Sequence, residues 1–581
     1  MKIIQSVIAM IFLASCTHPG HGLFHTLPGS ASPEARIQAE AYYHFIKGTG
    51  LERTGDFAGA VKEYKEALRL DPGSAQTALA LASVFLKTGQ MEDALAYART
   101  ASGLAPDDTD PLLLVAGILS ATKRHDEAIE AYRKAIVLDP KLEDAYIYLG
   151  NLYASLKRYE EAVTTFNALR RLNPNSLMVP YYLGRVYFER RMYNEALSEM
   201  NLAIELRPDF EPALTTMGVI YEILGRSEEA AAAYKKSLAL NPHNIEIWQR
   251  LAQIAIQQNS LDEALEYLKR IVEINRKDSD AYIKIGLIYI EKKEHRMAVD
   301  AFRIASSLTP GDVRIRNYLA SSLVALDQYE DALEEYRRIL DLEPGNTDAV
   351  IQVAYILSRM GRVAEAVAVL EQALERQPGK PELYLYLAAA YHDAGRHNDA
   401  VDVLKRGIEM APDRDDLLFS LAVAYDKSGM RLEMVDVLKK TIALNPGHAD
   451  ALNYLGYTYA EDGENLDEAV RLIKRALKIK PDSGYIQDSL AWAYFKQGKA
   501  SEALKVMHRA IKLVPDDPIM REHYGDIYLR LSNKRQARIQ WLKSLELDPS
   551  NEKLREKFKS AGFGDPDLLL KDVKPGKRKK K

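Results

Sequence analysis

The sequence predicts an all-α protein, a solenoid of about fifteen stacked helix–turn–helix units, and three regular series of residues predict it. Prolines recur every 34 residues, as at Pro72, Pro106 and Pro140. An alanine lies twelve residues before nearly every one of these prolines, and a glycine or alanine lies twelve residues earlier still. A fixed period of this length indicates stacked repeats rather than several separate globular domains.

The proline series runs through the chain with two irregularities. Its members are Pro72, Pro106, Pro140, Pro174, Pro208, Pro242, Pro310, Pro344, Pro378, Pro412, Pro446, Pro481, Pro515 and Pro549. Arg276 stands where one proline is due, and one extra residue within EDGENLDEA (461–469) shifts the last three. These two places are candidate hinges.

Physical chemistry explains the residue types in each unit. Two helices that cross at about 8–10 Å need glycine or alanine at the crossing. Proline has no N–H with which to continue a helix, so it ends the second helix of the unit. A single unit cannot bury its apolar face, and stacking on its neighbours buries it.

The unit that ends at Pro174 carries a full signature, which resembles the tetratricopeptide repeat. The residues are Tyr146, Leu149, Gly150, Tyr153, Ala162, Phe166 and Pro174. The resemblance covers about 41–549 and implies a right-handed superhelix with a concave groove that binds protein partners. It implies no cofactor.

The N-terminus reads as a bacterial lipoprotein signal. Lys2 precedes the apolar stretch 3–14, which is too short to span a bilayer, and small residues lead to Cys16, the single cysteine. LASC (13–16) resembles a lipobox, which implies cleavage after residue 15 and acylation of Cys16. Thr17 in place of aspartate favours the outer membrane, with the protein facing the periplasm.

The remaining segments follow in order along the chain. Residues 16–34 are rich in Pro, Gly, Ser and His and read as a flexible tether. His18, His21 and His25 in it lack the fixed geometry of a metal site, so no metal is predicted. Residues 35–549 form the repeat array and 550–564 a capping helix. Residues 565–581 end in KPGKRKKK and read as a disordered basic tail, with contact to a polyanion as the alternative.

Composition and motifs argue against several functions. A formal net charge of −4 with 28% charged residues gives no electrostatic case for nucleic acid. The sequence contains no phosphate loop, no HExxH and no nucleophile elbow. Carboxylate pairs such as EEA lie at helix starts, where the helix dipole favours them. The chain is therefore predicted not to be an enzyme and to take no small-molecule substrate.

Aromatic side chains mark the predicted groove. By the family resemblance, one groove position carries Tyr148, Tyr182, Tyr318, Tyr386 and Tyr454. A cluster of Tyr454, Tyr457, Trp492 and Phe495 is predicted to be exposed and to dock a partner. The alternative is that these rings pack between helices and fill the interior.

The stretch 451–498 carries a second resemblance. It is similar to a segment of bacterial outer-membrane repeat lipoproteins, some of which present substrates such as cell-wall hydrolases to a periplasmic carboxyl-terminal-processing protease. An adaptor of this kind is the first functional hypothesis. An assembly factor for a pilus, a secretion machine or exopolysaccharide export is the second, and a cytoplasmic co-chaperone is the third if the lipobox is misread.

Overall fold

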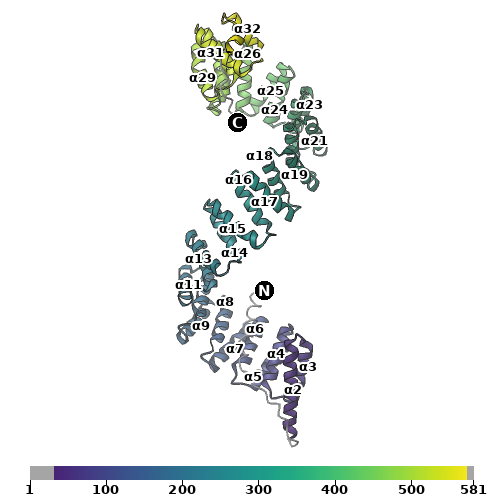
Figure 1. The fold of residues 1–581 in the computed structure, drawn as a ribbon, viewed down its shortest axis with the longest axis vertical. Helices are drawn as coiled ribbons and strands as arrows, with labels where there is room; N and C mark the ends of the chain where they lie inside the picture. Colours follow the sequence, from purple (N-terminus) through teal and green to yellow (C-terminus); the bar gives the residue numbers. More distant parts are fainter. Residues whose placement is uncertain (1–31, 572–581) are drawn as a thin grey trace. The chain divides into compact units, whose positions relative to one another are not determined.

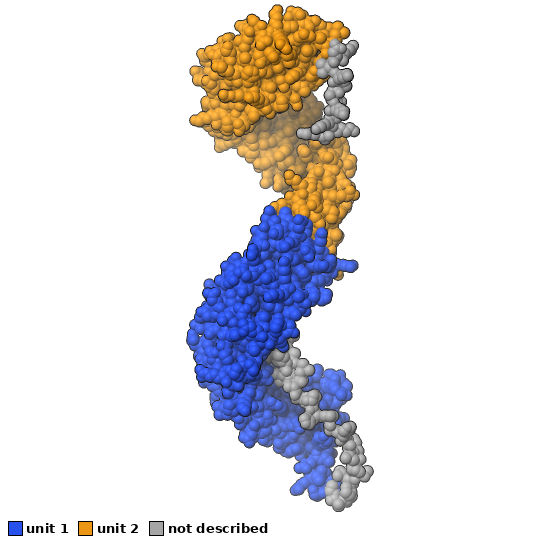
Figure 2. Space-filling view, turned by 60° about the vertical axis from the view of Figure 1, so that its left-hand side comes forward, with its two compact units in different colours: residues 1–276 blue, residues 277–581 orange. Residues whose placement is uncertain are grey.

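The computed structural model describes residues 32–571, which fold as consecutive α-helices without a β-strand in that range (Figure 1). The predicted all-α class is therefore confirmed. The chain divides into two compact units, residues 1–276 and 277–581 (Figure 2). The boundary between them falls at Arg276, where the proline series is interrupted.

Helices of the described residues pair in sequence within each unit, the even-numbered helix first. In the first unit they are α2 (Pro33–Arg53), α3 (Phe57–Leu70), α4 (Ala75–Lys87), α5 (Met91–Leu104), α6 (Thr109–Ala121), α7 (His125–Leu138), α8 (Glu143–Ser155), α9 (Tyr159–Leu172), α10 (Met178–Glu189), α11 (Tyr193–Leu206), α12 (Glu211–Ile223), α13 (Ser227–Leu240), α14 (Ile245–Gln257) and α15 (Leu261–Ile274). In the second they are α16 (Ser279–Glu291), α17 (His295–Leu308), α18 (Val313–Ala325), α19 (Tyr329–Leu342), α20 (Thr347–Arg359), α21 (Val363–Arg376), α22 (Pro381–Asp393), α23 (His397–Met410), α24 (Asp415–Lys427), α25 (Arg431–Leu444), α26 (Ala449–Asp462), α27 (Leu466–Ile479), α28 (Gly484–Lys496), α29 (Ala500–Leu513), α30 (Pro518–Arg530), α31 (Lys534–Leu547), α32 (Glu552–Ser560) and α33 (Pro566–Lys571).

The glycines of the repeat lie where the two helices of a pair approach most closely. A Cβ added to Gly150 of α8 would lie 2.5 Å from Cζ of Phe166 on α9. A Cβ on Gly218 of α12 would lie 2.3 Å from Cε1 of Tyr234 on α13. Real Cβ atoms do not approach this closely, so at Gly150 and Gly218 the ring occupies space that a larger side chain would need. The predicted helix crossing is confirmed.

Many of the turns after the prolines are closed by the same kind of side-chain hydrogen bond, which was not predicted from the sequence. The fourth residue of the following repeat donates from its side chain to the proline carbonyl six residues earlier. The Nε1 of Trp248 donates to the oxygen of Pro242 at 2.9 Å, and the Oη of Tyr384 donates to that of Pro378 at 2.8 Å. Tyrosine, tryptophan and arginine all serve, so the requirement is a long side chain with a donor. The further pairs are Tyr146 with Pro140, Arg316 with Pro310, Gln487 with Pro481, Arg521 with Pro515 and Arg555 with Pro549.

The ends of the array differ from their predicted boundaries. The helix α2 begins at Pro33, within the segment predicted as tether, because the Ser32 hydroxyl caps it by accepting from the Ala35 amide at 3.2 Å. Proline suits the first helical position, where its missing N–H needs no partner. Residues 566–571 of the predicted tail form α33. The residues Cys16, His18, His21 and His25 and the tail beyond 571 lie outside the described residues.

The C-terminal end of the array is covered by α32. Leu554 and Phe558 of this helix are fully buried against Trp541 and Leu545 of α31. The extra residue near 465 lengthens α26, which has 14 residues where α24 and α28 have 13. In the loop that follows, Gly463 and Asn465 have φ of +73° and +48°.

Candidate functional site

The five tyrosines predicted to line the groove share one position on five first helices. Each lies two residues before the glycine or alanine of the helix crossing. Two residues correspond to about 200° of helix rotation, so each ring points away from the second helix of its own pair. They are Tyr148 on α8, Tyr182 on α10, Tyr318 on α18, Tyr386 on α22 and Tyr454 on α26.

Two of these tyrosines pack against the preceding repeat. The ring of Tyr182 stacks on Phe166 of α9, with centroids 5.6 Å apart and an interplanar angle of 8°. The ring of Tyr148 lies 6.0 Å from that of Tyr132 on α7. Burial raises the pKa of Tyr148 to about 12. Both side chains are half-buried, so they contribute to packing between repeats.

Two of the remaining predicted tyrosines in the second unit are exposed, and so is a third tyrosine on the first helix between them. Tyr318 on α18 is 37% exposed, Tyr355 on α20 is 49% exposed and Tyr386 on α22 is 47% exposed. Tyr355 was missed from the sequence because it lies three residues further along its helix, which is one turn later on the same face. We call Tyr318, Tyr355 and Tyr386 the tyrosine row.

The tyrosine row combines an apolar surface with polar groups. Tyr318 is held in place by stacking on Phe302 of α17, with centroids 5.5 Å apart at 22°. A supported ring of this kind loses little conformational entropy when it meets a ligand. Exposed phenol rings offer apolar contact and a hydroxyl that both donates and accepts. Such a surface suits contact with a polypeptide.

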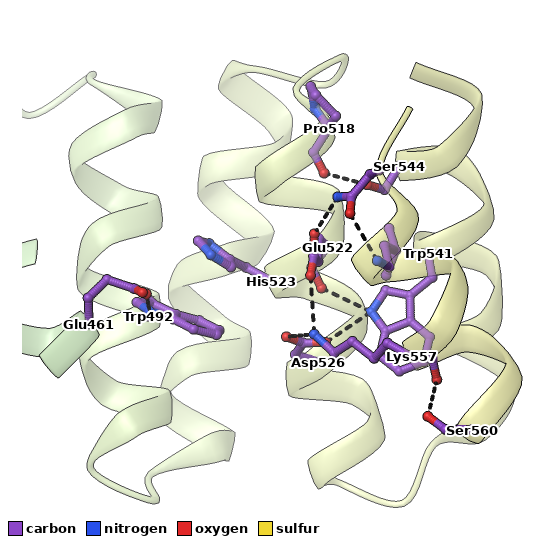
Figure 3. Close-up of polar contacts among 12 residues, drawn as sticks. Glu461, Trp492, Pro518, Glu522, His523, Asp526, Trp541, Ser544, Lys557 and Ser560 are labelled. Atoms are coloured by element: carbon purple, nitrogen blue, oxygen red, sulfur yellow. Dashed lines mark hydrogen bonds and ion pairs between the residues drawn. The ribbon is translucent and has the colours of Figure 1, made fainter. Parts of the chain in front are cut away.

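The predicted aromatic cluster near the C-terminus is interior rather than exposed. Trp492 of α28 is 8% exposed, and its ring stacks on His523 of α30 at 4.0 Å (Figure 3). The same ring stacks on Phe495 of α28 at 5.0 Å. Its indole N–H donates to the carboxylate of Glu461. The prediction of an exposed Trp492 is therefore wrong, because a side chain of the next repeat covers the ring.

Tyr454, Tyr457 and Phe495 of the same cluster are half-buried. The Oη of Tyr454 donates to Oδ2 of Asp426 on α24 at 2.7 Å. Burial raises the pKa of Tyr457 well above its usual value, and the nearby charge of Glu461 adds to the shift. Tyr454 thus links α26 to α24, and Tyr457 lies near Asp488 of α28. Replacing Tyr457 and Trp492 by alanine is expected to lower stability, which a docking site would not require.

A buried ion pair lies beside Trp492 and was not predicted. Nδ1 of His523 on α30 lies 3.0 Å from Oδ1 of Asp488 on α28, and both residues are buried. Burial lowers the pKa of His523, but the charge of Asp488 and its hydrogen bond raise it to a net value above the usual range. The sequence does contain a signal for this pair: an aspartate and a histidine stand at adjacent repeat positions of two consecutive first helices.

A second charged group attaches α32 to the array (Figure 3). Nζ of Lys557 lies 3.2 Å from Oε1 of Glu522 and also pairs with Asp526 of α30. The Nε1 of Trp541 donates to Oδ1 of Asp526 at 3.0 Å. Burial raises the pKa of Asp526, and Lys557 opposes that shift. Each of these charged groups has an ion-pair or hydrogen-bond partner within the fold, which indicates that the network is structural.

Between residues 32 and 571, no three or more His, Cys, Asp or Glu side chains are grouped so that they could hold a metal ion. Over the same range, no helix has the length and apolar character needed to cross a bilayer.

Sequence-family models match most of the array. Models described as tetratricopeptide repeats match residues 52–118, 118–157, 437–471 and 489–552. The model of the cilia and flagella-associated protein 70 C-terminal domain matches residues 143–352 and again 244–451. Two overlapping matches to one model, offset along the chain, are what a repetitive sequence produces.

Individual relatives are distant. BBSome complex member bbs-4 of Caenorhabditis elegans is 29% identical over 104 residues, which cover 18% of this chain and 22% of that protein. This chain therefore spans about a fifth of that relative's length. In the solved Cut9–Hcn1 hetero-tetramer of APC/C, one chain is 15% identical, covering 91% of this chain and 96% of that one with a TM-score of 0.37. YrrB, described as a TPR protein with an unusual peptide-binding site, is 19% identical, covering 34% and 97% with a TM-score of 0.27.

The family assignment rests on the repeat models together with the helix pairs. The matched ranges lie within the part of the chain that the recurring prolines and crossing glycines mark. The paired helices of the structure are the units that this period predicts. The chain belongs to the tetratricopeptide repeat family.

Proposed function

We propose that this protein is a non-catalytic scaffold whose first helices bind an extended or partly unfolded segment of a partner protein. The observation that carries the proposal is the tyrosine row, three exposed rings on the alternate helices α18, α20 and α22. Rings in series provide repeated apolar contacts, and an extended segment can satisfy the hydroxyls with its backbone groups. The tetratricopeptide repeat is a scaffold for protein–protein interaction, and membership of that family supports the same role.

We further propose that Cys16 carries a lipid and that the scaffold faces the periplasm from the outer membrane. The sequence LASC (13–16) with its apolar leader supports this location. The similarity of 451–498 to adaptor lipoproteins favours presentation of substrates to a periplasmic protease or a cell-wall hydrolase system.

The binding role is tested with a triple variant of the tyrosine row, Tyr318→Ala with Tyr355→Ala and Tyr386→Ala. Partners are captured by affinity purification of the lipidated protein and identified by mass spectrometry, and their affinities are then measured with purified components. We expect binding to weaken at least about tenfold, because exposed aromatic anchors dominate binding energy. Circular dichroism and melting temperature should be nearly unchanged.

The matched control is Leu432→Ala, which removes another exposed apolar side chain (82% exposed) from α25, a second helix. It should leave binding unchanged. A triple variant that binds the same partner with wild-type affinity would assign binding to another surface.

The anchor has its own test, which does not depend on the partner. Cys16→Ser should release the protein from the membrane fraction, since the several acyl chains of a lipoprotein bind firmly whereas the bare polypeptide does not. Sedimentation with membranes after a salt wash would show that the anchor is not at Cys16.

A further inference from the structure

The first helix of the array leaves a repeat-stacking surface open. Tyr43 on α2 occupies the third position of its repeat. The same position in the following first helices is buried against the preceding repeat, as at Thr77 (4% exposed), Ala145 (0%) and Val179 (1%). Tyr43 is 61% exposed. The described residues contain no repeat before α2 that could cover it.

The open surface is continuous along α2. Each member lies three or four residues from the next turn's member or members, which places them on one side of the helix. They are Ala35, Ala39, Tyr42, Tyr43, Ile46 and Gly50, which we call the α2 outer face. Tyr42 is 65% exposed and Ile46 is 53% exposed. A terminal repeat usually carries a polar outer surface that keeps the protein soluble, and this one is apolar.

The other end of the array is closed. Leu554 of α32 occupies the same third position and is fully buried, and α33 contacts both α31 and α32. Head-to-tail stacking of chains would need an open surface at both ends. An open surface at one end alone favours a contact of that surface with itself.

We propose that the α2 outer face binds the α2 outer face of a second copy of this chain, with the two helices antiparallel. The small residues Ala35, Ala39 and Gly50 allow the close approach of a helix, and Tyr42, Tyr43 and Ile46 supply the apolar area. A self-complementary contact of this kind closes with two-fold symmetry, the commonest arrangement of soluble oligomers.

Charges along one flank of this face decide between the two possible orientations. Glu40 and Lys47 lie on the same flank, seven residues or about two turns apart. Lys47 already pairs with Glu63 at 2.8 Å, yet its side chain remains 47% exposed. An antiparallel pairing places Glu40 near Lys47 of the partner subunit, twice by symmetry. A parallel pairing would instead place like charges together.

The test is the mass of the full chain in mild detergent, measured by light scattering after size exclusion with the micelle mass subtracted. The wild type should show twice the mass of one chain at micromolar concentration. The variant Tyr43→Glu with Ile46→Glu should raise the dimer dissociation constant at least about 100-fold, because it buries carboxylates at the contact. Its helicity and melting should be unchanged, since both side chains are exposed.

The matched control is Val137→Glu, which adds the same charge at a site of α7 that is 80% exposed. It should remain dimeric. A wild type that is monomeric throughout would overturn the proposal, whether residues 1–31 or another protein covers the face. A dimer that survives Tyr43→Glu with Ile46→Glu would place the contact elsewhere.

Two further measurements address orientation and lipid. Glu40→Lys should weaken an antiparallel dimer about threefold to tenfold by placing a positive charge near Lys47, whereas a parallel dimer would be unchanged. In a Cys16→Ser background, the same tyrosine–isoleucine variant should bind phosphatidylglycerol vesicles no differently from its parent. Vesicle binding that this variant loses would assign the face to lipid and overturn the proposal.

Discussion

At the scale of single residues, His523 makes stability depend on pH. Burial lowers the pKa of this side chain, and Asp488 of α28, with Asp526 of α30 and Glu461 of α26, raises it to a net value above the usual 6.5. A histidine whose pKa is higher in the folded state binds its proton more tightly there. Its contribution to stability is therefore complete below about pH 6.5 and is lost as pH rises through the folded-state pKa.

We expect the free energy of unfolding of the wild type to decrease as pH rises from 6 to above the folded-state pKa. The protonated ring also stacks on Trp492, so the loss includes a cation–π contact. In His523→Gln this decrease should be smaller, and the variant should be less stable at pH 6. Urea unfolding monitored by tryptophan fluorescence measures both. Equal pH profiles for the two proteins would show that His523 is neutral in the fold.

At the scale of elements, the turn at Arg276 can be restored to the pattern of the other repeats. Asn275 ends α15 with φ −126° and ψ 90°, nearly the values of Asp71 (φ −127°, ψ 84°), which precedes Pro72. This extended conformation is the one that a following proline requires. Arg276→Pro should therefore raise the free energy of unfolding by about 0.4–1 kcal/mol, because it restricts the unfolded chain.

The measurement for this variant is the urea midpoint, with Arg276→Ala as the control that removes the side chain without restricting the backbone. Arg276→Ala should show no gain. Destabilisation by Arg276→Pro would mean that the arginine amide is needed in the turn, and the interruption in the proline series would then have a structural cause.

The elements also show how far the sequence could predict the structure. The fixed spacing of prolines, alanines and glycines was sufficient to predict the helix pairs. Gly150 correctly marked a helix crossing, where it lies against the ring of Phe166. The exposure of a side chain was harder to predict, because it depends on the residue one repeat away. Trp492 is interior since His523 lies over it, while Tyr355 is exposed although its position has no signature.

At the scale of the whole molecule, contacts in this fold are local. Within each unit a helix contacts the helices next to it and the equivalent helix of the adjacent repeat, as α8 contacts α7, α9 and α10. Stability in such an array is a sum of repeat and neighbour terms, and damage to one repeat need not unfold distant ones. The crossing at Gly150 allows a direct test.

Gly150→Leu should cost about 1–3 kcal/mol, because its first carbon would lie 2.5 Å from the ring of Phe166. Hydrogen exchange should then show lost protection in α8, α9 and α10 and normal protection in α14 and α15. The matched control is Gly103→Leu in α5, where a Cβ meets no atom within 4 Å and the better helix former should leave stability equal or higher. Loss of protection along the whole chain in Gly150→Leu would mean that the repeats unfold as one cooperative body, against the additive behaviour expected of a solenoid.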